Sequence, residues 1–221
     1  MISVPRLYPI VNATDFPSTA HMRAFAEQLI HAGCNLLQYR NKSGNSRAML
    51  EQARELHWLF ASHANAAKSA ASGWGTRNPS FQLIMNDRAD LALIAEFDGV
   101  HVGQDDLLPE SVRKIIGPNR WLGVSTHNPE QVAEAEKTSA DYVAIGPVFA
   151  TMSKEKPDPV VGVEGVRRAR QLTRKPLVAI GGITRANAAS VIEAGADSVA
   201  VISDLLPDPG KSAEEFFRIL R

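Results

Sequence analysis

Short apolar runs alternate with longer stretches of helical periodicity along the whole chain. The apolar runs are short and bounded by turn-forming residues, which predicts strands. The stretches between them place apolar residues three or four positions apart, which predicts amphipathic helices. The predicted strands cover residues 7–11, 36–39, 81–85, 99–102, 121–125, 142–147, 177–181 and 198–202. The predicted helices cover residues 19–31, 46–66, 89–96, 110–116, 129–135, 162–172, 186–194 and 213–220.

The predicted strands are apolar almost throughout, which is typical of a parallel sheet covered by helices. Eight β/α units in 221 residues fit a (β/α)8 TIM barrel near the lower end of its size range. We therefore predict an α/β fold in which residues 1–221 form a single TIM-barrel catalytic domain.

A weak internal repeat supports the barrel. The segments HAGCNLLQ, TSADYVAI and EAGADSVAV share a small residue, then Asp or Asn, then an apolar strand, and EFDGVHV is a looser version. Gly or Ala suits the end of a helix, and the polar residue suits the turn into the next strand. We interpret these repeats as structural turns at the end of the barrel opposite the functional site.

One segment, residues 62–79, departs from the pattern because it is rich in Ala, Ser, Gly and Asn. We expect a frayed helix end followed by a mobile surface loop inserted before the third strand. A lid over the site is the alternative interpretation.

Composition narrows the possible partners. The 24 basic and 24 acidic residues cancel, so the charge supports neither nucleic-acid nor membrane binding. The single cysteine, Cys34, excludes an intramolecular disulfide and a zinc site built from several cysteines, and it lies in an apolar run that favours a core position. The chain shows no signal peptide and no run near the roughly 18 apolar residues of a membrane span, so we expect a cytoplasmic protein.

Polar clusters follow the third and fourth predicted strands. Asn86 and Asp87 come after the third strand, and Gln104, Asp105 and Asp106 come after the fourth. If the strands are parallel neighbours, two carboxylates face one small volume, which suits a hard cation such as Mg²⁺. The alternative is that Asp87 caps the next helix and Asp106 begins a turn.

Cationic and amide side chains follow the second strand. Gln38, Arg40 and Lys42 alternate along the sequence QYRNK, so they point the same way if the strand conformation persists. Two cations and an amide on one face suit a phosphate or diphosphate. The alternative is a solvated polar loop.

The later strands supply further candidates. His101 lies in the fourth strand, and Ser125, Thr126 and His127 end the fifth, where His127 is either an acid–base group or the start of the next helix. The long loop after the sixth strand carries Thr151, Ser153 and Lys154, which suit a phosphate.

Backbone at Gly181 and Gly182 after the seventh strand, and at Ile202 and Ser203 after the eighth, forms the usual phosphate site of a TIM barrel. Two anion sites and a metal indicate an enzyme that joins two phosphorylated molecules.

Seven motifs in order resemble the thiamine-phosphate synthase family. They are QYRNK (38–42), NDR (86–88), GVHVGQDD (99–106), GVS (123–125), GPVFATMSK (146–154), GGI (181–183) and VAVIS (199–203). Together they span essentially the whole chain. Three features depart from the family pattern: Ser153 stands where many members carry Thr, residues 62–79 are atypical, and the loop after Lys154 is Pro-rich.

The resemblance implies a role for each matching residue. The aminopyrimidine methyl diphosphate would be held by Gln38, Arg40, Lys42, Asn86, Ser125 and Lys154. Asp87 and Asp106 would bind Mg²⁺ on that diphosphate. The thiazole phosphate would be held by Thr151, Ser153 and the backbone at Gly182, Ile202 and Ser203. The expected substrate-binding set also includes the motif residues Tyr39, Asn41 and Met152, and the expected catalytic residues are Arg40, Lys42, Ser125 and Lys154.

The resemblance also implies the reaction: coupling of the two substrates to give thiamine phosphate and diphosphate. In the family diphosphate leaves first, and the thiazole nitrogen then captures a pyrimidine methyl cation. This route needs Mg²⁺ and cations to stabilise the leaving group and needs no protein nucleophile. Among partners, the sequence is compatible with a second copy of the chain in a homodimer.

Two other functions stay open at this point. One is a thiazole tautomerase of the same fold, which would not need the diphosphate-binding residues but would have a use for His127. The other is a non-catalytic protein that binds thiazole phosphate, for which the paired carboxylates have no purpose. The sequence also leaves open whether the thiazole substrate is the simple phosphate or a carboxylated form.

Overall fold

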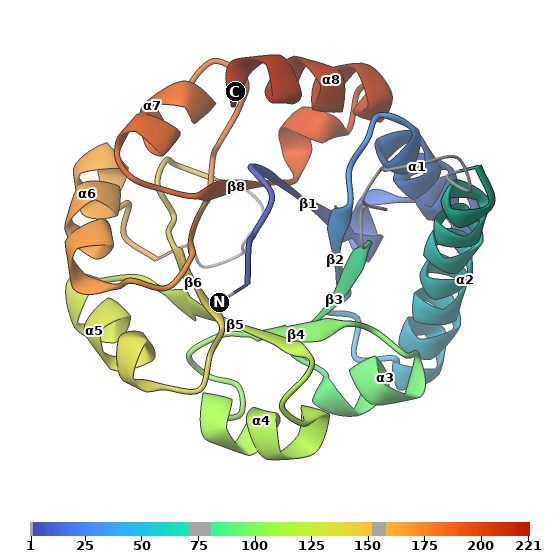
Figure 1. The fold of residues 1–221 in the computed structure, drawn as a ribbon, viewed down its shortest axis with the longest axis horizontal. Helices are drawn as coiled ribbons and strands as arrows, with labels where there is room; N and C mark the ends of the chain where they lie inside the picture. The colour runs from blue at the N-terminus through green and yellow to red at the C-terminus, as the bar shows by residue number, and fades with distance from the viewer. Residues whose placement is uncertain (1, 71–80, 152–157) are drawn as a thin grey trace.

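The computed structural model describes residues 2–70, 81–151 and 158–221 (Figure 1). Within these residues, parallel strands close into a barrel in chain order, and the last strand pairs with the first. The strands are β1 (Leu7–Asn12), β2 (Leu36–Arg40), β3 (Gln82–Asn86), β4 (Gly99–Val102), β5 (Trp121–Thr126), β6 (Tyr142–Ile145), β7 (Leu177–Ile180) and β8 (Ser198–Val201). The predicted α/β TIM barrel is confirmed.

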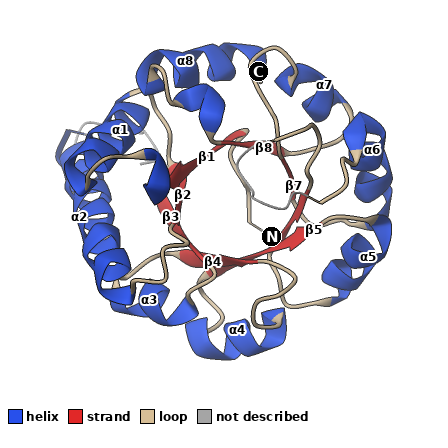
Figure 2. Cartoon of the chain, turned by 180° about the vertical axis from the view of Figure 1, so that it is seen from behind, coloured by secondary structure: helices blue, strands red, loops and turns tan. Residues whose placement is uncertain are grey.

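A ring of helices surrounds the barrel (Figure 2). The helices are α1 (Thr19–His31), α2 (Ser46–Ala70), α3 (Ala89–Ile94), α4 (Pro109–Ile116), α5 (Pro129–Lys137), α6 (Gly162–Leu172), α7 (Ala188–Glu193) and α8 (Pro209–Ile219). Short 3-10 helices η1 (Ala13–Asp15) and η2 (Ser203–Leu205) follow β1 and β8. Several helix starts are fixed by sequence, since Ser18, Asn128 and Asp208 cap α1, α5 and α8. None of the described helices is both long and apolar enough to cross a bilayer.

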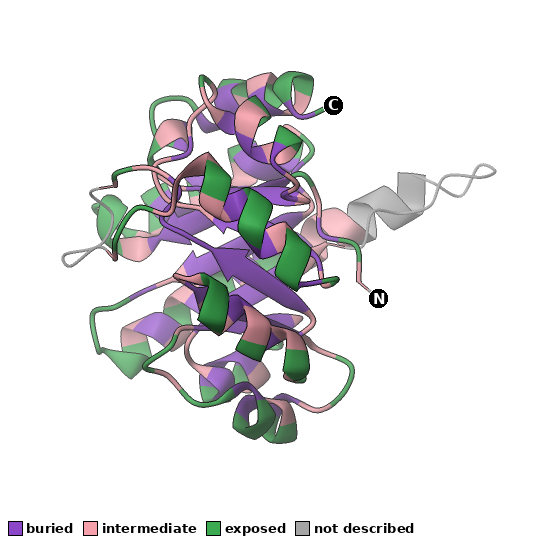
Figure 3. Cartoon of the chain, turned by 90° about the vertical axis from the view of Figure 1, so that its left-hand side faces the viewer, coloured by how far each residue is buried: buried purple, intermediate pink, exposed green. Residues whose placement is uncertain are grey.

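Two apolar layers fill the molecule because successive strand residues point to opposite faces. The outer layer lies between strands and helices and includes the buried Cys34, as predicted; burial raises the pKa of its thiol to about 12. The inner layer lies inside the barrel and includes Tyr8, Ile84 and Tyr142. The strands are accordingly buried, whereas the helices expose one face (Figure 3).

The repeated turns lie where the sequence predicts them. Asp98, Asp141 and Asp197 each precede a strand, and each carboxylate accepts a hydrogen bond of 2.8 Å from a backbone N–H of the strand before it in the barrel. Gly33 and Gly195 end α1 and α7 in the left-handed region, with φ of 101° and 106°. These turns therefore fix strand ends opposite the mouth of the barrel.

Some element boundaries differ from the prediction. Helix α2 continues to Ala70, so residues 62–70 of the expected insertion are helical, and 71–79 lie outside the described residues. Helix α8 begins at Pro209, four residues before the predicted start, because Asp208 accepts a hydrogen bond from the N–H of Lys211. Helix α7 begins at Ala188, later than predicted, because Thr184 and Asn187 hydrogen-bond to each other in the preceding turn.

Candidate active site

A cavity of about 460 Å³ opens at the carboxyl ends of the strands, where residues from widely separated parts of the chain meet. The predicted site residues that line it are Gln38, Arg40, Lys42, Asn86, Asp87, Asp106, Ser125, Thr151, Gly182, Ile202 and Ser203. Met152, Ser153 and Lys154 lie outside the described residues. The cavity also has an apolar part, to which Ile10, Ala144, Val178 and Ala200 contribute.

Tyr39 and Asn41, expected to bind substrate, are placed elsewhere. The Tyr39 hydroxyl donates to Oε1 of Gln52 on α2 at 2.6 Å, and the Asn41 amide donates to the same oxygen at 2.9 Å. Burial raises the pKa of Tyr39 to about 12. Neither side chain lines the cavity, because alternate residues of β2 point outward; they fix the end of β2 to α2 instead.

Asp87 and Asp106 lie together at the cavity wall, beside Lys42. The Lys42 ammonium donates to Oδ2 of Asp87. Burial raises the pKa of Asp87, Lys42 lowers it, and the neighbouring Asp106 carboxylate raises it again. Two carboxylates this close repel each other, and a bound cation relieves that repulsion. The predicted pairing of carboxylates across β3 and β4 is therefore present in the structure.

The capping alternatives have different outcomes. The N-cap of α3 is Arg88, with no side-chain cap, so Asp87 does not cap this helix. Asp87 instead has a φ of 62°, a left-handed conformation that Asp tolerates better than most residues. Asp106 does have a turn role, since its Oδ2 accepts from the N–H of Gly103 at 2.7 Å. One oxygen of Asp106 is thereby oriented by backbone.

Arg40 is held by a residue that the sequence analysis missed. Its Nη1 donates to Oδ1 of Asn12 at 2.8 Å, and the Asn12 amide donates to Thr14 and Asp15. Asn12 and Arg40 are register partners at the ends of β1 and β2. The guanidinium is therefore oriented before any ligand binds.

Asn86 carries a hydrogen-bond donor that no described residue uses. It is buried at the end of β3 and lines the cavity, and no described residue accepts a hydrogen bond from its Nδ2. A buried donor without a partner is costly, by about 1–3 kcal/mol. An oxygen of a bound anion satisfies this donor, which makes Asn86 a candidate ligand contact.

A chain of hydrogen bonds crosses the interior of the barrel below the cavity. Gln38 donates to the Tyr8 hydroxyl at 3.0 Å, and the Tyr8 and Tyr142 hydroxyls are 2.8 Å apart. The Tyr142 hydroxyl lies 3.1 Å from Nδ1 of His101, whose Nε2 lies 2.8 Å from Oγ of Ser125. Five strands thus contribute to one polar network.

The network has a direction. Gln38 donates to Tyr8, and the arrangement that gives each buried hydroxyl hydrogen an acceptor within the network has Tyr8 donating to Tyr142 and Tyr142 donating to Nδ1 of His101. Burial lowers the pKa of His101 to about 4, so this imidazole is neutral near pH 7 and carries its hydrogen on Nε2. In that arrangement Ser125 accepts from Nε2 of His101, which leaves the hydroxyl hydrogen of this cavity-lining serine available to a ligand.

The shifted pKa of His101 predicts acid sensitivity of the fold. The folded pKa of about 4 lies below the ordinary value of 6.5, so the unfolded chain binds the extra proton first. The free energy of unfolding therefore falls as pH is lowered from 6.5 to 4. The fall that is due to His101 amounts to about 3 kcal/mol at most. Urea unfolding at both pH values should show this fall in the wild type. In His101→Gln the acid-induced fall should be smaller, and the difference between the two proteins should be close to the His101 contribution. An equal acid-induced loss in both proteins contradicts the assignment.

His127 lies at the cavity wall before α5, whose N-cap is Asn128. Its Nδ1 lies 2.6 Å from the carbonyl oxygen of Gly146, and its Nε2 lies 3.5 Å from Asp158. A carbonyl only accepts, so Nδ1 carries a hydrogen. His127 thereby links the loops that follow β5 and β6.

The opposite side of the cavity is built from glycine and backbone. Gly182 has a φ of 63°, and an added Cβ would lie 2.4 Å from the carbonyl oxygen of Ala150. Arg185, whose importance the sequence did not reveal, donates from its backbone N–H and its Nε to Asp204 at 2.8 and 3.0 Å. These contacts fix the loop after β7 against η2, where Ile202 and Ser203 line the cavity.

Comparison with known proteins gives a consistent result. Residues 7–205 match the family model described as thiamine monophosphate synthase. The thiamine-phosphate synthase of Koribacter versatilis (strain Ellin345) is 54% identical, covering 99% of this chain and 97% of that protein. The thiamine-phosphate synthase of Chloroflexus aurantiacus is 42% identical over 90% of this chain and 83% of that protein. A solved thiamine phosphate pyrophosphorylase from Pyrococcus furiosus superposes with a TM-score of 0.80 at 30% identity, covering 97% of this chain and 95% of that one.

Proposed function

Because this chain belongs to the thiamine monophosphate synthase family, and is thus a transferase that acts on two phosphorylated substrates, we propose that its barrel-mouth cavity is the catalytic site. The reaction joins an aminopyrimidine methyl diphosphate to a thiazole phosphate and gives thiamine phosphate and diphosphate. The observation that carries the proposal is the grouping of Asp87, Asp106 and Lys42 beside the unused donor of Asn86.

Asp87 and Asp106 are proposed to hold Mg²⁺. The fit rests on their chemistry, since both offer carboxylate oxygens and their mutual repulsion contributes to the raised pKa of Asp87. Bound there, the cation would stabilise negative charge on a departing diphosphate. Lys42 already bonds to Asp87, so its ammonium lies beside the proposed cation site and would stabilise the same departing diphosphate.

Arg40, Lys42 and Asn86 are proposed to bind the diphosphate. Arg40 is oriented by Asn12, and Asn86 offers an N–H that no described residue accepts. Fixed donors aimed at a leaving group stabilise the charge that develops as the bond breaks. Lys154 is expected to complete this set, although it lies outside the described residues.

Ser125 is proposed to act as a hydrogen-bond donor and not as a nucleophile. A nucleophilic serine needs a base that accepts its proton. Here His101 is neutral and presents an N–H to Ser125, because its other nitrogen is occupied by Tyr142. A serine that accepts from His101 cannot pass its proton to that ring. This favours the dissociative route, in which diphosphate leaves before the thiazole nitrogen forms the new bond.

The thiazole phosphate is proposed to bind at Thr151 and at the backbone of Gly182, Ile202 and Ser203. The left-handed conformation at Gly182 excludes a side chain there and lets an anion approach the backbone. Ser153, Met152 and further contacts from the same loop remain expectations from the sequence.

The same-fold tautomerase is the weaker alternative, because such a protein has no use for the Asp87, Asp106 and Arg40 group. The relatives at 54% and 42% identity are both thiamine-phosphate synthases, which agrees with this preference. A cytoplasmic location and a homodimer belong to the proposal as expectations from the sequence.

The test is diphosphate release by the purified protein. With both substrates and Mg²⁺ we expect equal amounts of diphosphate and thiamine phosphate, measured by a coupled phosphate assay and by chromatography. Omission of either substrate, or chelation of Mg²⁺ by EDTA, should stop product formation. Absence of release under complete conditions contradicts the catalytic assignment, and release without the thiazole indicates hydrolysis instead.

A further inference from the structure

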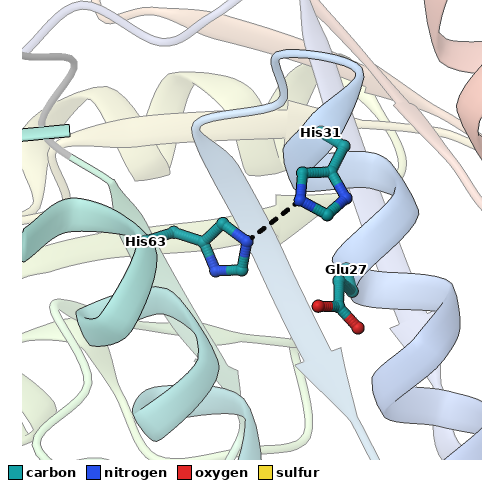
Figure 4. Close-up of side chains that lie close together, drawn as sticks. All are labelled: Glu27, His31 and His63. Carbon is teal, nitrogen blue, oxygen red and sulfur yellow. Dashed lines mark hydrogen bonds between the residues drawn. The ribbon is translucent and has the colours of Figure 1, made fainter. Parts of the chain in front are cut away.

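Two histidines and a glutamate meet on the outer surface of the barrel, between α1 and α2 (Figure 4). Glu27 and His31 are four residues apart on α1, so they share one face of that helix, and His63 projects from α2. One ligand-type atom from each residue lies within 4.8 Å of the other two. None of the three lines the catalytic cavity, and His31 ends its helix at the opposite end of the barrel.

The tautomer of His63 is set by its own helix. Its Nδ1 lies 3.0 Å from the carbonyl oxygen of Leu59, one turn earlier. Since a carbonyl accepts only, Nδ1 carries the hydrogen and Nε2 of the neutral ring presents its lone pair to His31. A backbone carbonyl that fixes the distal ring nitrogen is the usual support of a metal-binding histidine.

The spacing of the two imidazoles fits a tetrahedral ion. Nε2 of His31 and Nε2 of His63 are 3.3 Å apart. Two nitrogens bound to one zinc ion at about 2.0–2.1 Å with a tetrahedral angle are separated by about 3.3 Å. Glu27 is only partly buried, and one of its carboxylate oxygens already lies within 4.8 Å of a ring nitrogen of each histidine.

We propose that Glu27, His31 and His63 bind one ion of the Zn²⁺ class and thereby link α1 to α2. Two imidazoles and one carboxylate suit a borderline-soft cation, whereas Mg²⁺ prefers oxygen ligands. Three protein ligands leave a fourth position for water. Without the ion, His31 donates through Nε2 to His63; with it, His31 holds its hydrogen on Nδ1 and both Nε2 atoms face the metal.

The test is Zn²⁺ titration of the metal-stripped full-length protein in excess Mg²⁺, which keeps the carboxylates of the catalytic cavity occupied. Calorimetry should show one Zn²⁺ per chain with micromolar or tighter affinity. Loss of an outer partner of a metal ligand already costs about 10–100-fold in affinity, so His31→Gln and His63→Gln should each cost at least about tenfold. Substitution with Co²⁺ should give the visible absorption of a tetrahedral nitrogen–oxygen site.

Matched controls come from the same two helices. His21→Gln on α1 and His57→Gln on α2 remove exposed or half-exposed imidazoles outside the cluster, and both should retain wild-type affinity. Glu27→Gln provides a third variant should either histidine variant fold poorly, and circular dichroism checks each fold. Unchanged affinity in all three cluster variants, equal losses in the controls, or no Zn²⁺ binding by the wild type overturns the proposal.

Discussion

Replacement of Asp87 by Ala is expected to lower turnover by about three orders of magnitude while the barrel stays folded. Asp87 does not cap α3, and among the described residues its side chain interacts with Lys42 and Asp106, so its removal deletes half of the carboxylate pair without breaking a helix end. The leaving diphosphate then loses the cation that the pair is proposed to hold. Steady-state kinetics at saturating substrates, with Mg²⁺ varied, measures the effect.

The matched control is Asp105→Ala, which removes an exposed carboxylate that lines the same cavity three residues beyond the end of β4. The sequence motif places the metal ligand at Asp106 and treats Asp105 as a bystander, so this variant should keep kcat within about threefold of wild type. Near-normal turnover of Asp87→Ala contradicts the metal role. Equal losses in both variants indicate that general negative charge, rather than ligation, matters at this edge.

The carboxylate site was predictable because it depends on strand order alone. Asn86 pairs with His101 in the register of β3 and β4, so residues just beyond these strands must meet at one edge. The alternation of Gln38, Arg40 and Lys42 was predictable for a similar reason, since side chains of one strand take opposite faces in turn. The same rule places Tyr39 and Asn41 on the outer face, whereas the sequence analysis expected all five residues of the QYRNK motif to bind substrate.

The polar network was not predictable because it depends on how the barrel closes. Tyr8 and Tyr142 are 134 residues apart and meet only because β1 and β6 face each other across the interior. A tyrosine within an apolar strand was the available signal, since a buried hydroxyl needs a partner. The support of Arg40 by Asn12 likewise needs the register of β1 and β2, which the sequence did not supply.

The extent of α2 was missed for a local reason. Residues 62–70 contain Ser and Asn, which favour a loop, but they also contain Ala, the strongest helix former. The helix continues to Ala70, four residues beyond the predicted end at residue 66, so His63 lies a full turn inside it, and its Nδ1 reaches the carbonyl of Leu59. The candidate zinc site therefore depends on the part of the helix end that the prediction treated as frayed.

The polar network predicts coupled losses of activity when Ser125, at its cavity end, and Tyr142, in its middle, are replaced. Ser125→Ala removes a fixed donor from the cavity and should lower kcat about 100-fold. Tyr142→Phe leaves Nδ1 of His101 without its donor, so the ring is free to move its hydrogen and Ser125 loses its fixed orientation; we expect about a tenfold lower kcat. If Tyr142 acts through Ser125, the double variant should be no slower than Ser125→Ala alone, because the second change removes nothing further.

The control is Tyr39→Phe, since Tyr39 is also a fully buried barrel tyrosine but its hydroxyl bonds to Gln52 on the outer face. It removes one buried hydroxyl, as Tyr142→Phe does, and should cost stability without lowering kcat. Strictly additive losses in the double variant contradict a role of Tyr142 through Ser125. A kcat for Tyr39→Phe as low as that for Tyr142→Phe shows that both act by loosening the barrel, because only one of these tyrosines belongs to the chain of donors that ends at the cavity.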